Sequence, residues 1–125
     1  MSPLGWVAFV VAGAVGAPAR YLVDGWVQDR TPGDSFPWGV LVVNVTGSFL
    51  LGLVSGLALY HGFPKVPRLV LGTGFCGAYT TFSTFTFDTV RLLEEGATAT
   101  AWRYVATTVA LATAAAAAGL GLAAI

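Results

Sequence analysis

Hydroxyl and phenyl side chains alternate in one stretch of this sequence, from Gly72 to Asp88, which reads GTGFCGAYTTFSTFTFD. Hydroxyl groups donate hydrogen bonds, so they can replace the water that surrounds an anion. Phe82 and Phe85 are three residues apart and share a helical face, and the edges of their rings carry partial positive charge. Phenylalanines in such a pattern are more often core residues. Their alternation with Ser83 and Thr84 instead favours an anion site or an anion path.

Further hydrogen-bond donors lie in the other apolar segments. Asn44 and Ser48 are four residues apart and share a helical face, as do Tyr104 and Thr108. Polar side chains at membrane depth either join helices or form a functional site, and both interpretations of Asn44 stay open. His61 has no second His or Cys at ligand spacing, so we expect no metal site there. No catalytic triad, nucleotide-binding loop or intramembrane carboxylate pair is recognisable, which argues against an enzyme.

Four long apolar segments must position these groups. Of the 125 residues, 56% are hydrophobic and 10% are charged, whereas soluble domains carry about a quarter charged residues. A helix needs about 20 residues to cross a bilayer. The segments of that length are approximately residues 4–23, 38–60, 66–93 and 102–125. The sequence therefore predicts an all-α membrane protein, with residues 1–125 as a single four-helix transmembrane domain in lipid.

The third segment contains helix-weakening residues near its centre. Gly72, Gly74 and Gly77 disfavour continued helix, and the neighbouring hydroxyl groups compete for backbone hydrogen bonds. Non-helical backbone at membrane depth persists only where protein buries it or where it lines a polar cavity. We therefore expect a helix break near residues 77–80, beside a buried ion site or a pore wall.

Positive charges are distributed almost evenly between the two sides of the predicted bundle. Four crossings put both termini on one side, with Lys65 and Arg68, while Arg30, Arg91 and Arg103 flank the other side. This bias is too weak to fix one orientation. Arg20, near the end of the first segment, is either a topology anchor or a contributor to anion attraction or fold closure. The formal net charge is zero, so no basic surface is expected to bind nucleic acid.

Three motifs together are similar to a known family. They are GAPARY from Gly16 to Tyr21, VNVTGSFLLG from Val43 to Gly52, and GFCGAYTTFSTF from Gly74 to Phe85. The chain resembles the Fluc family of fluoride channels, also called CrcB, over essentially its whole length, and the GxYTTFSTF element is highly specific. The resemblance implies a passive fluoride-selective channel that exports the ion from the cytoplasm, in the cell membrane of a prokaryote.

The resemblance also implies an assembly and a cofactor. Family members form antiparallel, dual-topology homodimers with two pores. A structural Na⁺ lies at the dimer centre, held by backbone carbonyls of the broken third helix. Gly77 and Thr80 match the positions that supply those carbonyls. Arg20 matches the arginine of the first-helix motif.

The same resemblance assigns the pore residues. Phe82 and Phe85 match the phenylalanines that line the pores, and Asn44 matches the pore asparagine of the second helix. The polar track beside them is matched by four further residues: Ser83, Thr84, Tyr104 and Thr108.

Three positions depart from the family pattern, and other functions compete with a channel. Val40 and Ala112 stand where hydroxyl residues are usual, and Asp88 stands where Glu is usual. A heterodimer with a related chain therefore stays open beside the homodimer. The competing functions are a small proton-coupled carrier and a non-transporting membrane scaffold. A carrier needs an ionisable group in mid-membrane, whereas the acidic residues here lie near helix ends.

Overall fold

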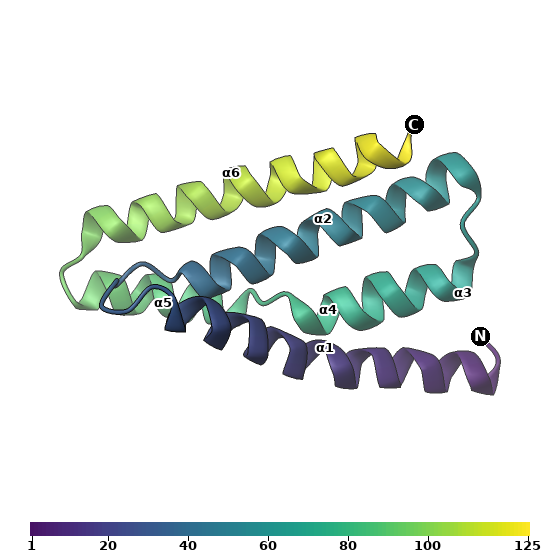
Figure 1. The fold of residues 1–125 in the computed structure, drawn as a ribbon, viewed down its shortest axis with the longest axis horizontal. Coiled ribbons are helices and arrows are strands. Elements are labelled where there is room, and N and C mark those ends of the chain that lie inside the picture. Colours follow the sequence, from purple (N-terminus) through teal and green to yellow (C-terminus); the bar gives the residue numbers. More distant parts are fainter.

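The computed structural model describes residues 1–125, and every regular element in it is a helix, as predicted. The chain makes four antiparallel passes, so both termini lie at the same end of the molecule (Figure 1). The elements are α1 (Pro3–Asp29), α2 (Trp38–His61), α3 (Lys65–Arg68), η1 (Leu69–Cys76), α4 (Gly77–Tyr79), α5 (Ser83–Glu94) and α6 (Thr98–Ala123). Three of them, α1, α2 and α6, are long and apolar enough to cross a membrane. The protein is a multi-pass membrane protein.

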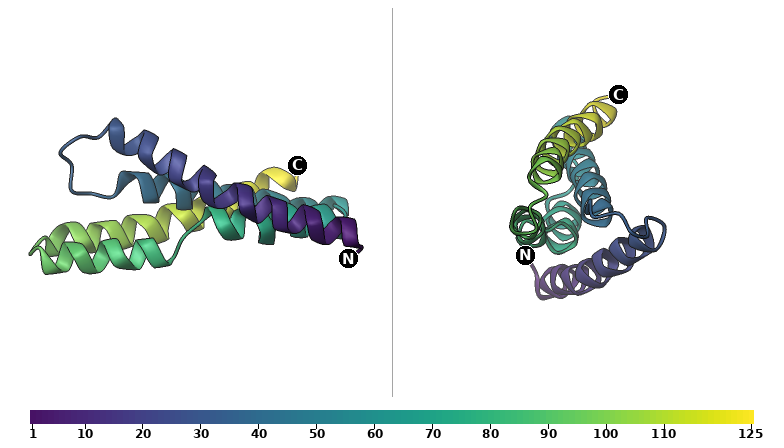
Figure 2. Two further views of the ribbon diagram at one scale, coloured as in Figure 1. Left: turned by 90° about the horizontal axis from the view of Figure 1, so that it is seen from below. Right: turned by 90° about the vertical axis from the view of Figure 1, so that its left-hand side faces the viewer.

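The helices pack side by side in the order α6, α2, the third pass, and α1 (Figure 1). Helix α2 contacts both α6 and η1, while α1 lies mainly against η1 and α4. Viewed from two further directions, α1 crosses the other helices at an angle (Figure 2). Helix α5 lies against α6 at the opposite end of the molecule from the termini. The third pass therefore lies between α1 and α2 in its first half and beside α6 in its second.

The third pass consists of four elements. After α3, residues Leu69–Cys76 form the π-helix η1, whose turns are wider than those of an α-helix. Helix α4 ends at Tyr79, and Thr80 is extended, with φ −75° and ψ 157°. Helix α5 begins at Ser83. Residues 80–82 thus lie between two helical parts, close to the middle of the molecule.

Glycines bring α2 and α6 into direct backbone contact. A Cβ atom at Gly52 would overlap the carbonyl oxygen of Ala116, and one at Gly119 would overlap that of Phe49. At Gly56 it would lie 2.6 Å from the Cβ of Ala123. Small residues are the usual means by which membrane helices approach closely, because lipid gives them no hydrophobic drive to associate. The α2–α6 pair therefore forms a tightly packed wall.

Helix α1 is longer than the apolar segment that predicted it. It continues past Val23 to Asp29, and Arg30 ends it. The polar residues of this extra part include Asp24 and Gln28, which are joined by a hydrogen bond of 2.8 Å from Gln28 Nε2 to Asp24 Oδ1. Side-chain pairs four residues apart stabilise a helix outside the hydrocarbon. The connector to α2 is consequently short, comprising residues 30–37.

Candidate functional site

One side chain of α2 holds the backbone between α4 and α5. Asn44 Nδ2 donates to the carbonyl oxygen of Thr81 at 3.0 Å, and Thr81 N–H donates to Asn44 Oδ1 at 2.9 Å. Asn44 is 9% exposed and Thr81 is also buried. A buried backbone amide that leaves the helical ladder needs another partner, and the carboxamide supplies both a donor and an acceptor. Asn44 therefore substitutes for the missing helical hydrogen bonds at this point.

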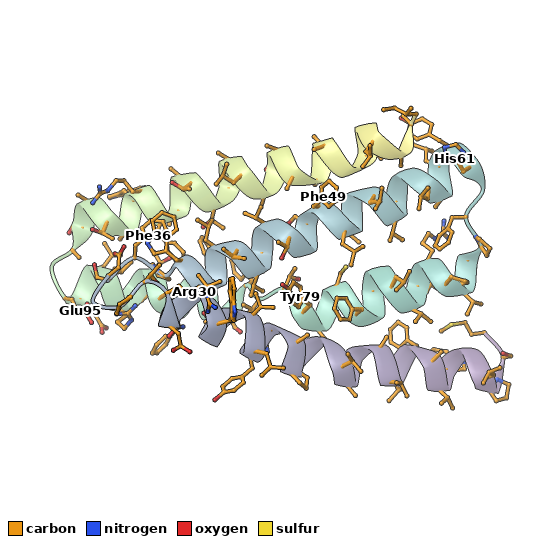
Figure 3. All side chains as sticks on the ribbon, in the orientation of Figure 1. Arg30, Phe36, Phe49, His61, Tyr79 and Glu95 are labelled. Atoms are coloured by element: carbon orange, nitrogen blue, oxygen red, sulfur yellow. The ribbon has the colours of Figure 1, made fainter.

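The hydroxyl groups around Thr81 support the same backbone. Thr81 Oγ1 accepts from the backbone N–H of Thr84 at 3.1 Å, which satisfies a free amide in the first turn of α5. It also lies 3.3 Å from Ser83 Oγ. On the other side, Thr80 Oγ1 donates to the carbonyl of Cys76 at 2.8 Å. Tyr79, labelled near the middle of Figure 3, joins its hydroxyl to Thr46 of α2 at 2.9 Å. These bonds give residues 80–82 a defined conformation.

An open hollow of about 370 Å³ lies against this segment. Its wall combines α2, residues 80–82, α5 and α6. The twelve residues that line it are Asn44, Gly47, Ser48, Leu51, Thr80, Thr81, Phe82, Phe85, Thr108, Val109, Ala112 and Thr113. The hollow thus brings amide and hydroxyl groups together with two phenyl rings. Such a lining can replace the water around a small ion on one side and exclude bulk water on the other.

The two phenylalanines occupy different environments. Their ring centroids are 6.0 Å apart with an interplanar angle of 46°. The Phe82 side chain is 79% exposed on the surface of the single chain. Phe85 packs against the buried cluster of Val40, Leu92, Ala101 and Tyr104. Phe82 is therefore free to contact a partner or an ion, while Phe85 is fixed by its neighbours.

Two hydroxyl groups of α6 are buried without a hydrogen-bond partner. They belong to Tyr104, which is fully buried, and to Thr108, one turn further along the helix. The Tyr104 ring lies 5.1 Å from the Phe85 ring. Leaving a hydroxyl group unpaired inside a protein costs about 1–3 kcal/mol, so an unexplained pair marks a place where a ligand can be accommodated. Thr108 lines the hollow, whereas Tyr104 packs against the Phe85 ring and does not line it.

Two backbone carbonyls at the α4–α5 junction, those of Gly77 and Thr80, are the candidates for holding a cation. Because Thr81 N–H donates to Asn44, it does not donate to the Gly77 carbonyl four residues earlier, as it would in a helix. Gly77 is exposed, and a Cβ there would meet no atom within 4 Å. The Thr80 carbonyl accepts a long contact of 3.4 Å from Arg20 Nη1. Carbonyl oxygens at unwound helix ends are typical Na⁺ ligands, so the Gly77 carbonyl fits such an ion, whereas Arg20 places a positive charge at the Thr80 carbonyl in the single chain.

The structure gathers part of the predicted set around one hollow. Asn44, Thr80, Phe82, Phe85 and Thr108 line it together. Ser83 and Thr84 lie at the start of α5 and contact Thr81 instead. Tyr104 lies behind Phe85, and Arg20 and Gly77 are outside the lining.

Seven of the twelve lining residues lie outside the predicted site: Gly47, Ser48, Leu51, Thr81, Val109, Ala112 and Thr113. Thr81 stood out only as one hydroxyl group among several, and its link to Asn44 joins residues 37 positions apart. Gly47 and Thr113 carried no signal by residue type. Spacing could have found Gly47, which follows Asn44 by three residues, but not Thr113, which is five residues after Thr108 and so does not share its helical face.

Comparison with known proteins gives one consistent family. Residues 7–120 match the family model described as CrcB-like protein, Camphor Resistance (CrcB). The chain is 53% identical over 95 residues to "Fluoride-specific ion channel FluC 1" of Leifsonia xyli subsp. xyli, which covers 76% of this chain and 69% of that protein. It is 46% identical over 121 residues to the protein of the same name from Symbiobacterium thermophilum, covering 95% and 97%. A third such protein, from Frankia casuarinae, is 47% identical over 126 residues and covers 96% of both chains. Since the family model spans residues 7–120 and the second and third of these relatives cover at least 95% of the chain, the chain belongs to the CrcB family.

Proposed function

We propose that this protein is a passive, fluoride-selective ion channel of the bacterial cell membrane. The observation that carries the proposal is the convergence of Asn44, Phe82, Phe85 and Thr108 on one hollow beside the α4–α5 junction. Similar proteins across several bacteria are named fluoride-specific ion channels. Fluoride is small and strongly hydrated, so a path for it needs closely spaced donors in a narrow space.

The residues of the proposed path have different roles in conduction. The buried hydroxyl groups of Tyr104 and Thr108 donate to the ion, in place of the partner that each lacks. The rings of Phe82 and Phe85 present their positive edges and exclude water. Asn44 keeps the backbone of Thr81 in place and has one amide hydrogen left for the ion. Ser83 and Thr84 fix the beginning of α5, which carries Phe85.

The functional unit is an antiparallel dimer with dual topology and two pores. Three observations support this proposal. The hollow is open on one side, Phe82 lies 79% exposed at its rim, and the positive charges do not favour one orientation. A second copy that covers this face would bury Phe82 and close the hollow. In this assembly the Gly77 and Thr80 carbonyls of both copies hold a structural Na⁺. The ion coordinates oxygens that accept no helical hydrogen bond.

Fluoride efflux from vesicles tests the function. The purified single polypeptide is reconstituted in liposomes loaded with fluoride, and external fluoride is recorded with an ion-selective electrode. Rapid efflux that is independent of a pH gradient, with chloride retained, is the expected result. Efflux coupled to protons would indicate a carrier, and no efflux would indicate a scaffold or a chain that needs a different partner. Either result would contradict the proposal of a homodimeric channel.

A further inference from the structure

The connector between α1 and α2 places an aromatic ring over the Tyr104 side chain. Phe36 is half-buried, and its ring meets that of Tyr104 edge to face, with centroids 5.4 Å apart and an interplanar angle of 85°. It also packs against the cluster formed by Val40, Leu92 and Ala101. Figure 3 shows Phe36 between α6 and α5, at the end of the molecule remote from the termini. A connector residue thus covers a side chain whose hydroxyl group has no partner.

Asp34 fixes the backbone that carries this ring. Its Oδ1 atom accepts from the backbone N–H of Phe36 at 2.9 Å, and its Oδ2 atom accepts from Trp38 Nε1 at 2.7 Å. Hydrogen bonds to a charged carboxylate are stronger than neutral ones. The Trp38 ring lies 4.5 Å from the Phe36 ring. The position of Phe36 is therefore set by a compact three-residue arrangement rather than by a helix.

Two polar hollows meet at Phe36. One, of about 250 Å³, extends from the connector to Asp88 and Arg91 of α5. The other, of about 380 Å³, extends to Arg103 and Thr107 of α6. Both are lined by Asp34, Ser35 and Phe36, and Tyr104 lines neither. Phe36 therefore lies between two solvent-accessible spaces on one side and the buried hydroxyl group of Tyr104 on the other.

We propose that Phe36 is the narrowest point of the ion path at the connector end, where its ring must move aside for fluoride to pass between the two polar hollows and Tyr104. The proposal rests on the proposed channel function, because it assumes that the Tyr104 and Thr108 hydroxyl groups lie on the path. A ring attached to a short connector is displaced by rotation of a few bonds, without unpacking a helix. The two hydrogen bonds that the Asp34 carboxylate accepts, from the Phe36 N–H and from Trp38 Nε1, set how often the ring moves aside.

Stepwise removal of the ring provides the test. Fluoride efflux is measured in liposomes for the wild type, Phe36→Leu and Phe36→Ala. Efflux is expected to rise in that order, several-fold for the alanine variant, since each step widens the passage to Tyr104. Phe63→Ala is the matched control, because Phe63 is also a half-buried connector phenylalanine but lies in the connector after α2. Its efflux rate is expected to equal that of the wild type.

A second variant distinguishes a constriction from a merely structural contact. Asp34→Ala removes the two hydrogen bonds that the carboxylate accepts from Phe36 and Trp38 and keeps the ring, and we expect a smaller rise in efflux than with Phe36→Ala. A structural role alone predicts slower efflux and a lower melting temperature for all three variants, which would overturn the proposal. Rates equal to the wild type would overturn it as well. If the wild type itself shows no efflux, the proposed function fails first, and this inference fails with its premise.

Discussion

Asn44 and Thr81 exchange a reciprocal pair of hydrogen bonds, of 3.0 Å and 2.9 Å, between the middle of α2 and the backbone that joins α4 to α5. The Asn44 carboxamide thus supplies hydrogen bonds to a segment that has lost its helical ones. The same side chain lines the hollow with Phe82 and Phe85. The conformation of the segment and the chemistry of the proposed path therefore depend on one residue.

Asn44→Asp is expected to suppress fluoride efflux by at least tenfold and to lower stability. The carboxylate cannot donate to the Thr81 carbonyl, and it adds a negative charge beside an anion path. Removing one partner of a buried hydrogen bond costs about 1–3 kcal/mol. Efflux and thermal unfolding in detergent measure the two effects. Ser48→Ala, one turn along the same wall, makes no such backbone bond and should keep the wild-type melting temperature. Equal melting temperatures for Asn44→Asp and the wild type would contradict the structural role.

Replacing either ring of the phenyl pair should slow efflux for different reasons. Phe82→Ile leaves the folding stability of the single chain nearly unchanged because Phe82 is exposed there, and it removes the positive ring edge from the hollow. Phe85→Ile also loosens the cluster around Tyr104, at a cost of about 1 kcal/mol. Phe87→Ile is the control, since Phe87 is 67% exposed on α5 and does not line the hollow. Efflux at wild-type rates in both test variants would exclude the pair from the path.

Withdrawal of Na⁺ should weaken the proposed dimer. If the Gly77 and Thr80 carbonyls of two copies share the ion, replacing Na⁺ by choline removes a ligand that only the assembled state binds, and association falls by mass action. Sedimentation velocity in detergent at several protein concentrations measures the dimer fraction. K⁺, which is larger, should restore it poorly. A dimer fraction independent of the cation would contradict the Na⁺ site without touching the evidence for the hollow.

Filling a glycine of the α2–α6 contact should destabilise the protein strongly. The Cβ of Gly52→Ala would overlap the Ala116 carbonyl, which belongs to backbone and cannot turn aside. Overpacking of this kind costs about 1–3 kcal/mol or more. Gly121→Ala serves as the control on α6, because a Cβ there meets nothing within 4 Å. That control should gain up to about 1 kcal/mol from improved helix propensity. Similar melting temperatures for the two variants would refute the close contact.

Acid should loosen the connector between α1 and α2. Hydrogen bonds from the Phe36 backbone and from the Trp38 indole, with some help from Arg103, lower the pKa of Asp34 below its ordinary value of 3.8. The native state therefore holds the carboxylate more strongly than the unfolded chain does. Its contribution to stability is complete above pH 3.8 and is lost as the pH falls through the lower native pKa. Comparing the melting temperatures of wild type and Asp34→Asn from pH 6 to pH 3 checks this. The difference between the two melting temperatures should narrow only below pH 4. A difference that stays constant with pH would contradict the role of the Asp34 carboxylate.

Residue type and periodicity predicted much of this architecture. Apolar segments long enough to cross a bilayer predicted the four passes, because in lipid the backbone N–H and C=O groups must be hydrogen-bonded within the protein. The spacing of Phe82 and Phe85 placed them on one face, and Asn44 and Thr108 do line the same hollow with them.

The remaining features depend on contacts distant in sequence. The bond from Asn44 to Thr81 requires α2 and the third pass to be adjacent, and no local pattern encodes that. The continuation of α1 to Asp29 escaped prediction because polar residues at a helix end carry no hydropathy signal. Phe36 falls between the apolar segments 4–23 and 38–60, and its position over Tyr104 follows only from the three-dimensional fold.

The backbone contact of Gly52 with Ala116 and of Gly119 with Phe49 has a mechanical consequence. At these positions backbone meets backbone, with no side chain that could turn to make room, so sliding of α2 against α6 is restricted there. We therefore expect the width of the hollow to vary mainly at its other wall, formed by residues 80–82 and the exposed ring of Phe82. Fluctuations in the current through a single pore would accordingly report on bond rotations in residues 80–82 rather than on movements of whole helices.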